Sequence, residues 1–171
     1  MNDYTKALLF YKKALAIEQS TFSPGHEDIG TSYSNVGRVY DHMGEYSLAL
    51  IYLQAAVDVL EKTLPPFHHS LATCYDDIGK LYYNMEEYSK ALVYCEKALE
   101  IRENTGVPYH PTIAWFCNNI GMIYEKMRDY RKAFSFYQRA FDIAQERLPI
   151  SHSDRKLYQD NHRNIKKHLY Y

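Results

Sequence analysis

The chain has 171 residues, of which 46% are hydrophobic, so it could bury ample apolar surface. Its 20 Lys and Arg residues against 21 Asp and Glu residues give a formal net charge of −1, which excludes a net field that attracts nucleic acid or anionic membranes. No apolar run approaches the roughly 20 residues of a membrane-spanning helix, and the N-terminus lacks a secretory pattern, so we expect a cytoplasmic protein without nucleic-acid or membrane partners.

The first predicted element is a helix at about residues 3–20, and the phrase M-N-D-Y that opens the chain returns at a spacing of 42 residues. Its copies read M-G-E-Y at 43–46, M-E-E-Y at 85–88 and M-R-D-Y at 127–130. Self-similarity at such a period is typical of solenoids, in which one unit cannot bury its apolar face alone. The sequence therefore predicts one elongated array of stacked units.

The six prolines divide the rest of the chain into helical hairpins. They lie in four zones, at 24, 65–66, 108–111 and 149, and proline disfavours helix interiors. Between the first two zones, apolar residues recur at four-and-three spacing, which predicts a first (A) helix at 27–43 and a second (B) helix at 46–63. The later helices are predicted at 69–86, 88–105, 111–128, 130–147 and 153–169.

The apolar stripes also predict which side of each helix is buried. In the first complete hairpin, the stripe of the A helix comprises Ile29, Tyr33, Val36, Tyr40 and Met43. The stripe of the B helix comprises Tyr46, Ala49, Leu50, Leu53, Ala56, Val57 and Leu60. In the last helix only Leu157, Ile165 and Leu169 keep an apolar stripe.

These elements predict an array that begins half way through a repeat. Residues 1–21 form the B helix of a truncated repeat, residues 22–63, 64–105 and 106–148 form complete repeats, and residues 149–171 form a degenerate capping helix with a polar back. The apolar residues of the first helix lack a preceding partner, and their exposure would invite self-association. They are Ala7, Leu8, Tyr11, Ala14 and Leu15.

Small and aromatic residues recur in register at the positions where helices would touch. The columns are Gly37, Gly79 and Gly121; Tyr40, Tyr82 and Tyr124; Ala7, Ala49, Ala91 and Ala133; and Ala14, Ala56, Ala98 and Ala140. The Gly-x-x-Tyr phrase followed by two alanines resembles the tetratricopeptide repeat signature. A 42-residue unit with phrases such as Y-x-N-V-G-x-V-Y and M-G-E-Y is similar to the kinesin light chain subclass. The resemblance implies an all-α, right-handed α-solenoid of antiparallel helical hairpins that binds proteins.

Each A helix carries a second stripe at four-three-four spacing, such as Thr31, Asn35, Arg38 and His42. In the family this face lines a concave groove, so the resemblance implies that the groove binds an extended peptide. The candidate groove residues are Thr31, Asn35, Arg38, Thr73, Asp77, Lys80, Trp115, Asn119, Met122 and Lys126. The corresponding residues of the last helix are Leu157, Asn161, Asn164 and His168.

The chemistry of these side chains suggests how a peptide would be held. The amides of Asn35, Asn119 and Asn161 could bond a peptide backbone, whereas Asp77 interrupts this series. Arg38 and Lys80 could receive an acidic residue. Trp115 has two interpretations, as an anchor for a ligand side chain or as a packing residue against the last helix. For the polar residues the alternative is a solvated helix face.

No motif in the sequence indicates catalysis. His26, His68, His110 and His152 repeat at 42 residues, but units separated by helix contacts of roughly 8–10 Å cannot gather zinc ligands at about 2 Å. We therefore interpret them as loop residues next to helix starts. Cys74, Cys95 and Cys117 lack metal-binding spacing and are interpreted as buried, reduced thiols. A phosphate loop, a nucleophile elbow and H-E-x-x-H are absent, so we expect no enzyme activity, no catalytic residue, no cofactor and no metal.

The sequence thus leaves three functions open. The leading hypothesis is a scaffold that binds an extended peptide of a partner protein in the A-helix groove, with an acidic peptide as one option. The second is a structural module that self-associates through the uncapped first helix. The third is a regulatory repeat fragment of a larger multidomain protein.

Overall fold

The computed structural model describes residues 2–106 and 110–170, and within these ranges all regular structure is α-helical. The helices are α1 (Asn2–Thr21), α2 (Glu27–His42), α3 (Tyr46–Thr63), α4 (His69–Asn84), α5 (Tyr88–Glu103), α6 (Pro111–Lys126), α7 (Tyr130–Arg147) and α8 (Ser153–Tyr170). Each predicted helix is present, with ends that differ from the prediction by no more than two residues. None of the helices in these ranges has the length and apolarity needed to span a bilayer.

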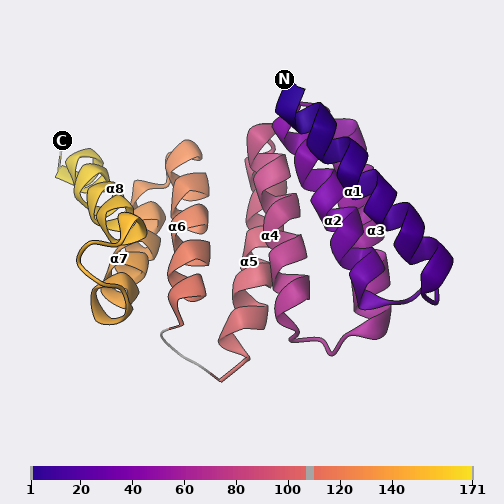
Figure 1. Ribbon diagram of the computed structural model, residues 1–171. Coiled ribbons are helices and arrows are strands. Elements are labelled where there is room, and N and C mark those ends of the chain that lie inside the picture. Colours follow the sequence, from indigo (N-terminus) through magenta and orange to yellow (C-terminus); the bar gives the residue numbers. More distant parts are fainter. Residues whose placement is uncertain (1, 107–109, 171) are drawn as a thin grey trace.

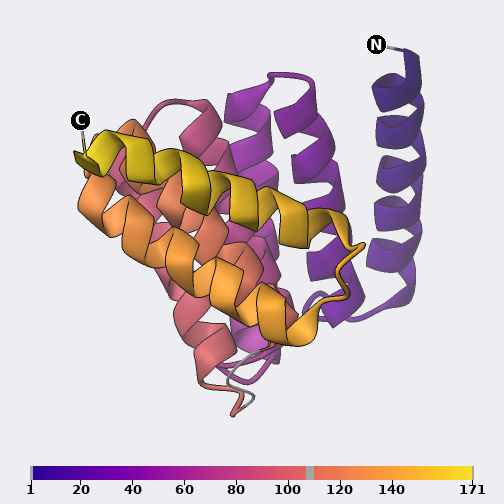
Figure 2. The ribbon, with the colours of Figure 1, turned by 90° about the vertical axis from the view of Figure 1, so that its left-hand side faces the viewer.

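The helices stack side by side in chain order, from α1 at one end of the molecule to α8 at the other (Figures 1 and 2). The A helices are α2, α4, α6 and α8, and the B helices are α1, α3, α5 and α7. Each helix packs against its neighbours in sequence, and α2 also contacts α4. The all-α helical repeat predicted from the sequence is therefore confirmed.

Each of the first three A helices ends in the same backbone turn. The amide of Glu45 donates to the carbonyl of Tyr40 at 2.9 Å, and the amide of Gly44 donates to Asp41 at 2.9 Å. These two bonds define a Schellman turn, whose residue after the cap adopts a positive φ. Gly44 has φ +77°, but Glu86 and Arg128 occupy the same position at φ 61° and 60°. The predicted helices at 69–86 and 111–128 ran too far because these two residues carry no glycine signal.

The core runs through the array as a series of A–B contacts. A Cβ at Gly37 would lie 2.7 Å from Leu53, and a Cβ at Gly121 would lie 2.7 Å from the ring of Tyr137. Each glycine therefore lets a larger residue of the B helix approach the A-helix backbone. The alanine columns of α3, α5 and α7 are fully buried beside these contacts. The small residues in register thus occupy the seams between helices.

Most of the predicted buried stripe is confirmed, with two exceptions. Met43 is 40% exposed because α2 ends at His42 and Met43 is its C-cap. Leu157 is 45% exposed, and α8 instead buries Tyr158 and His162 together with the predicted Ile165. In α1, the predicted exposure of Leu15 was wrong, because that side of the helix packs against α2 and buries it.

Candidate functional site

Hydrogen bonds between consecutive A helices cross the face on which the candidate groove residues were predicted. The Asn119 amide donates to Asp76 at 3.0 Å, and the Asn161 amide donates to Asn118 at 2.8 Å. Three similar contacts join residues that are also 43 positions apart: Ser34 to Asp77, Ser70 to Glu27 and Asn84 to Asp41. The asparagine amides of α6 and α8 therefore each use one N–H to join neighbouring repeats.

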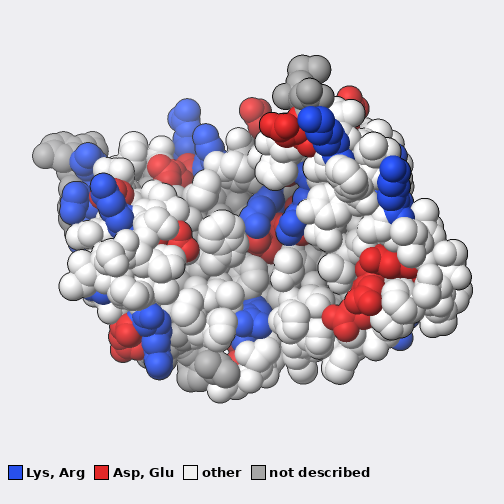
Figure 3. Space-filling view, in the orientation of Figure 1, with Lys and Arg blue, Asp and Glu red and all other residues white. Residues whose placement is uncertain are grey.

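The first hollow on this face brings together half of the predicted groove residues. It has a volume of roughly 510 Å³ and lies among α1, α2, α4 and α6. Its lining includes Asn35, Arg38, Asp77, Lys80 and Trp115. Figure 3 shows basic and acidic side chains side by side near the middle of this face, over α4. Charges of both signs therefore gather in this hollow.

Asp76 is the common acceptor at the edge of this hollow, and sequence reasoning did not select it. Its carboxylate is 3% exposed and accepts from the Trp115 indole Nε1 at 3.1 Å and from Asn119. It also forms an ion pair with Lys80, whose ammonium lies 4.8 Å from the centroid of the Trp115 ring. The sequence feature that could have identified Asp76 is its repeat position, which Ser34 and Asn118 share; both are also polar and buried.

Trp115 is therefore held by α4. This contact is neither the predicted anchor for a ligand nor the predicted packing against the last helix. The indole is 38% exposed, so part of the ring faces solvent while its N–H is bonded to a buried carboxylate. A ring with a fixed orientation loses little conformational freedom when a ligand contacts it. Trp115 can thus present a preoriented aromatic surface.

Asp77 is buried beside Asp76 and accepts a hydrogen bond from the Ser34 hydroxyl at 3.0 Å. Burial raises the pKa of Asp77 to about 6, while the positive charges of Lys80 and Arg38 oppose this shift. Lys80 lies between both carboxylates, with its ammonium 3.9 Å from Asp77. The charge of Lys80 is therefore largely compensated within the protein.

Asn35 and Arg38 differ from Lys80 because their polar groups remain available. Arg38 is exposed and takes part in none of the ion pairs found in the described ranges. The half-buried Asn35 amide has no hydrogen-bond partner among the described residues.

A second hollow, of about 570 Å³, receives two further predicted residues. Met122 and Lys126 of α6 line it together with Leu157, Asn161 and His168 of α8. His168 stacks on Tyr130 with ring centroids 4.7 Å apart. The remaining predicted residues line neither hollow: Thr31 is exposed, Thr73 bonds to the His69 carbonyl at 3.1 Å, and Asn119 bonds to Asp76. The predicted stripe is thus divided between two separate hollows.

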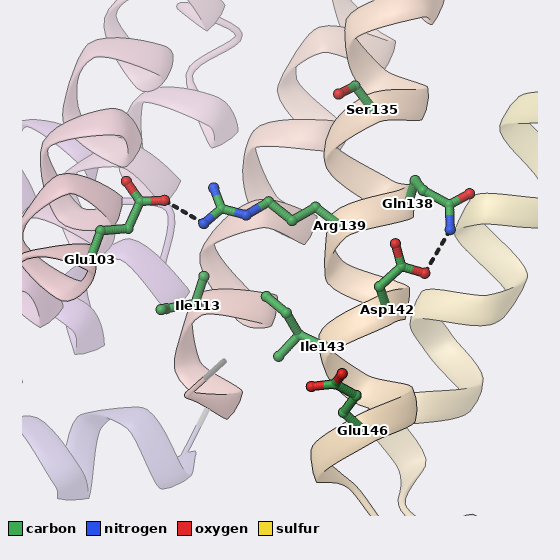
Figure 4. A pocket seen from close by; sticks show the side chains of 8 residues that line it. All are labelled: Glu103, Ile113, Ser135, Gln138, Arg139, Asp142, Ile143 and Glu146. Atoms are coloured by element: carbon green, nitrogen blue, oxygen red, sulfur yellow. Dashed lines mark hydrogen bonds and ion pairs between the residues drawn. The ribbon is translucent and has the colours of Figure 1, made fainter. Parts of the chain in front are cut away.

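A third hollow, which sequence reasoning did not predict, lies where α5, α6 and α7 meet (Figure 4). Figure 4 shows Arg139 of α7 reaching across to Glu103 of α5, with which it forms an ion pair. Gln138 donates to Asp142 at 2.7 Å on the same helix. Polar groups of this hollow therefore bond to one another, with Ile113 and Ile143 between them.

The histidine column consists of N-caps, in agreement with its predicted place at helix starts. The Nδ1 atoms of His26, His68, His110 and His152 accept from backbone amides two residues later at 3.2–3.3 Å. In the described part of the chain, no group of three or more potential metal ligands comes together. The three cysteines are buried, and burial raises the pKa of Cys74 and Cys117 to about 12, so their thiols are unreactive.

Comparison with known proteins agrees with the repeat geometry. The family model described as tetratricopeptide repeat matches residues 1–62, 42–104 and 70–146. The chain is similar in structure to a protein from Podosopora anserina with nearly identical TPR-like repeats of the kinesin light chain kind. The TM-score is 0.81 at 18% sequence identity, and the match covers 98% of this chain and 80% of the other.

Two further structures show the same arrangement of helices. BtubC (BKLC) from P. vanneervenii gives a TM-score of 0.86 at 22% identity, with 98% of this chain and 66% of that chain covered. The N-terminal domain of stress-induced protein-1 from C. elegans gives 0.61 at 16% identity, covering 84% of this chain and 96% of the other. At these identities the likeness concerns the fold alone. No curated protein matches the sequence of this chain.

Proposed function

The chain belongs to the tetratricopeptide repeat family, and from this membership we propose that it is a non-catalytic scaffold that binds an extended peptide of a partner protein. The binding site is the hollow among α1, α2, α4 and α6. The observation that carries the proposal is the availability of Asn35 and Arg38 beside the partly exposed ring of Trp115.

Each of these three side chains would contribute a different contact. The Asn35 amide both donates and accepts, so it can bond the main chain of a peptide whatever its side chains are. Arg38 can bond a carboxylate through two parallel N–H groups. The Trp115 ring, fixed by its bond to Asp76, would receive an apolar or aromatic side chain. The site thus favours a peptide with one acidic and one apolar side chain.

Acid recognition in this site depends on Arg38 more than on Lys80. Lys80 is compensated by Asp76 and Asp77, and a ligand carboxylate would have to compete with both. The exposed guanidinium of Arg38 has no such competitor at ion-pair distance. From the sequence, Arg38 and Lys80 were predicted to bind an acidic residue equally well. Because only Lys80 is paired with buried carboxylates, we now assign this role to Arg38.

The test is a selection of linear peptides from a random library on the wild-type chain. The selected peptides are then measured by fluorescence anisotropy against Asn35→Ala, Arg38→Ala and, as a control of equal charge change, Lys62→Ala on α3. We expect affinity to fall at least tenfold for the first two variants and to stay unchanged for the control. Selected peptides that bind all variants equally would exclude this hollow as the site.

A structural role is the second candidate function, and one observation favours it. Phe10 of α1 is 67% exposed and Ile17 is 64% exposed, which is unusual for large apolar side chains on one helix face. This surface lies on the outer side of α1 and differs from the peptide site.

A further inference from the structure

Asp77 is the ionisable member of a column that is otherwise asparagine. The same repeat position holds Asn35, Asn119 and Asn161 in the other A helices. An asparagine and a protonated aspartate have nearly the same shape, and both carry a hydrogen-bond donor, whereas an ionised aspartate only accepts. Asp77 lines the hollow proposed as the peptide site. The site therefore contains a side chain that can exist in an asparagine-like form and in a charged form.

Asp77 forms the cross-repeat contact of its column with the opposite polarity. In the next repeat, Asn119 donates its amide N–H to Asp76 on the preceding A helix. Asp77 contacts Ser34 on its own preceding A helix at 3.0 Å, but there the Ser34 hydroxyl donates and the carboxylate accepts. A hydroxyl can also accept, so a protonated Asp77 can donate to the same oxygen. The contact between α2 and α4 therefore accommodates both forms of Asp77.

Asp77 and Asp76 share one cation, and the two carboxylates are not equally stabilised. Both are buried, and Lys80 pairs with both of them. Asp76 is the closer partner of Lys80 and also accepts from two N–H groups of α6. Asp77 has the Ser34 hydroxyl and an ammonium 3.9 Å away. Adjacent buried carboxylates repel each other, so the less stabilised one binds a proton first. That one is Asp77, and burial raises its pKa to about 6.

We propose that Asp77 takes up a proton from solvent when an acidic peptide binds, so that the site holds acidic side chains more tightly as pH falls. The inference rests on the proposed function of this hollow. With both buried carboxylates ionised, they balance the charges of Lys80 and Arg38, and a ligand carboxylate adds a negative charge that nothing in the cluster offsets. With Asp77 protonated, the cluster carries one positive charge in excess. A ligand carboxylate then makes the set of charges neutral.

Other titratable groups face this cluster and have to be distinguished from Asp77. Those that line the hollow are Tyr4 and Tyr11 of α1, and Arg38, Asp41 and His42 of α2. From α3 the hollow receives the apolar Leu53. The thiols of Cys74 and Cys95 lie beside the two carboxylates, and burial raises their pKa, so they are neutral near pH 6. Because histidines change charge between pH 5 and 8, His42 is the group that needs a control.

The first test needs no ligand, because Trp115 is the only tryptophan of the chain and its ring lies 4.8 Å from the Lys80 ammonium. We expect the tryptophan fluorescence of the full chain to titrate with a midpoint at about pH 6. The titration should be absent in Asp77→Asn, which restores the asparagine of the column, and present in His42→Gln. A signal that does not titrate between about pH 7.5 and 5, or that titrates equally in Asp77→Asn, would overturn the proposal.

The second test measures binding by anisotropy with the tightest acidic peptide from the library selection and with its analogue in which Asn and Gln replace Asp and Glu. We expect the affinity of the acidic peptide to rise about fivefold from about pH 7.5 to about pH 5, where its own carboxylates are still mostly ionised. The affinity of the analogue should stay constant. Asp77→Asn should bind the acidic peptide equally tightly at both pH values, whereas His42→Gln should keep the dependence on pH.

The two proposals for this hollow fail in different ways. A constant affinity across this pH range that is still lost in Arg38→Ala would overturn the role of Asp77 and leave the peptide site standing. An affinity that Arg38→Ala does not change would exclude the site itself, and the role of Asp77 with it.

Discussion

Trp115 and Asp76 are joined by a hydrogen bond of 3.1 Å that runs from the A helix of one repeat to the A helix of the repeat before it. The same carboxylate accepts from Asn119 and pairs with Lys80. Two side chains that line the peptide site, those of Trp115 and Lys80, are therefore positioned by one buried group. Stability and ligand binding are coupled at this point of the array.

We expect Asp76→Ala to lower the free energy of unfolding by about 2–3 kcal/mol, because the change leaves a tryptophan N–H, an asparagine amide and a lysine without their acceptor. The figure is kept low because Lys80 is 38% exposed and water can replace part of the loss. Urea denaturation is the measurement. Asp58→Ala, at an exposed carboxylate on α3, should change stability by less than about 0.5 kcal/mol, and a similar loss in both variants would contradict the role of Asp76.

Substitutions of Lys80 and Arg38 should have different effects on stability and on peptide binding. Lys80→Met leaves two adjacent buried carboxylates without their cation, and we expect a loss of about 1–2 kcal/mol at neutral pH. Arg38→Met should leave stability within about 0.5 kcal/mol of the wild type and weaken the binding of acidic peptides. Denaturation and anisotropy measured on both variants check this. If Lys80→Met weakened peptide binding and Arg38→Met lowered stability, Lys80 would be the residue that binds the acidic side chain, as first predicted.

His162 should make the docking of α8 sensitive to acid. It lies in the column of Val36, Ile78 and Ile120, and its Nε2 is buried without a hydrogen-bond partner among the described residues. Burial and the charge of Lys166 lower its pKa, and Asp142 partly opposes this. The unfolded chain therefore binds a proton more readily, so stability from this group is present above the unfolded pKa of about 6.5 and is lost as pH falls below it.

The matching variant is His162→Ile, which restores the aliphatic column. We expect it to raise stability by about 1 kcal/mol at pH 7, because an unsatisfied nitrogen is removed from the core. The gain should grow between pH 6.5 and 5, where the wild type loses stability. The difference between wild type and His162→Ile isolates the contribution of His162, because Asp77 is present in both. The raised pKa of Asp77 makes stability fall as pH rises through about 6, which is the opposite dependence on pH. A constant difference across this range would show that His162 does not titrate in the fold.

The histidine N-caps predict a graded effect of substitution at position 110. His110→Ala removes the acceptor for the Thr112 amide and should cost about 1 kcal/mol. His110→Asn keeps a side-chain acceptor at the helix start and should restore most of that loss. Thermal denaturation of both variants provides the comparison. Equal losses would mean that the ring of His110 contributes by packing and that its Nδ1 bond is unimportant.

The fold could be predicted almost completely because one period of 42 residues repeats every stabilising feature. The exceptions are local: Glu86 and Arg128 adopt a positive φ that their residue types do not announce, and Leu157 lies one ridge away from the buried stripe. The candidate site could be predicted only in part. The stripe was predicted, but its bonds between repeats were not. The bonds of Asn119 and Asn161 join different repeats at an offset of one residue and that of Trp115 at an offset of three, and no pattern within a repeat fixes these offsets.

Hydrogen bonds between side chains 43 positions apart join the four A helices in series, from Ser34 to Asp77, from Asn119 to Asp76 and from Asn161 to Asn118. Such bonds require a narrow range of distances and angles. A change in the curvature of the array would have to break at least one of them. We therefore expect the array to keep the same curvature whether or not a ligand occupies it.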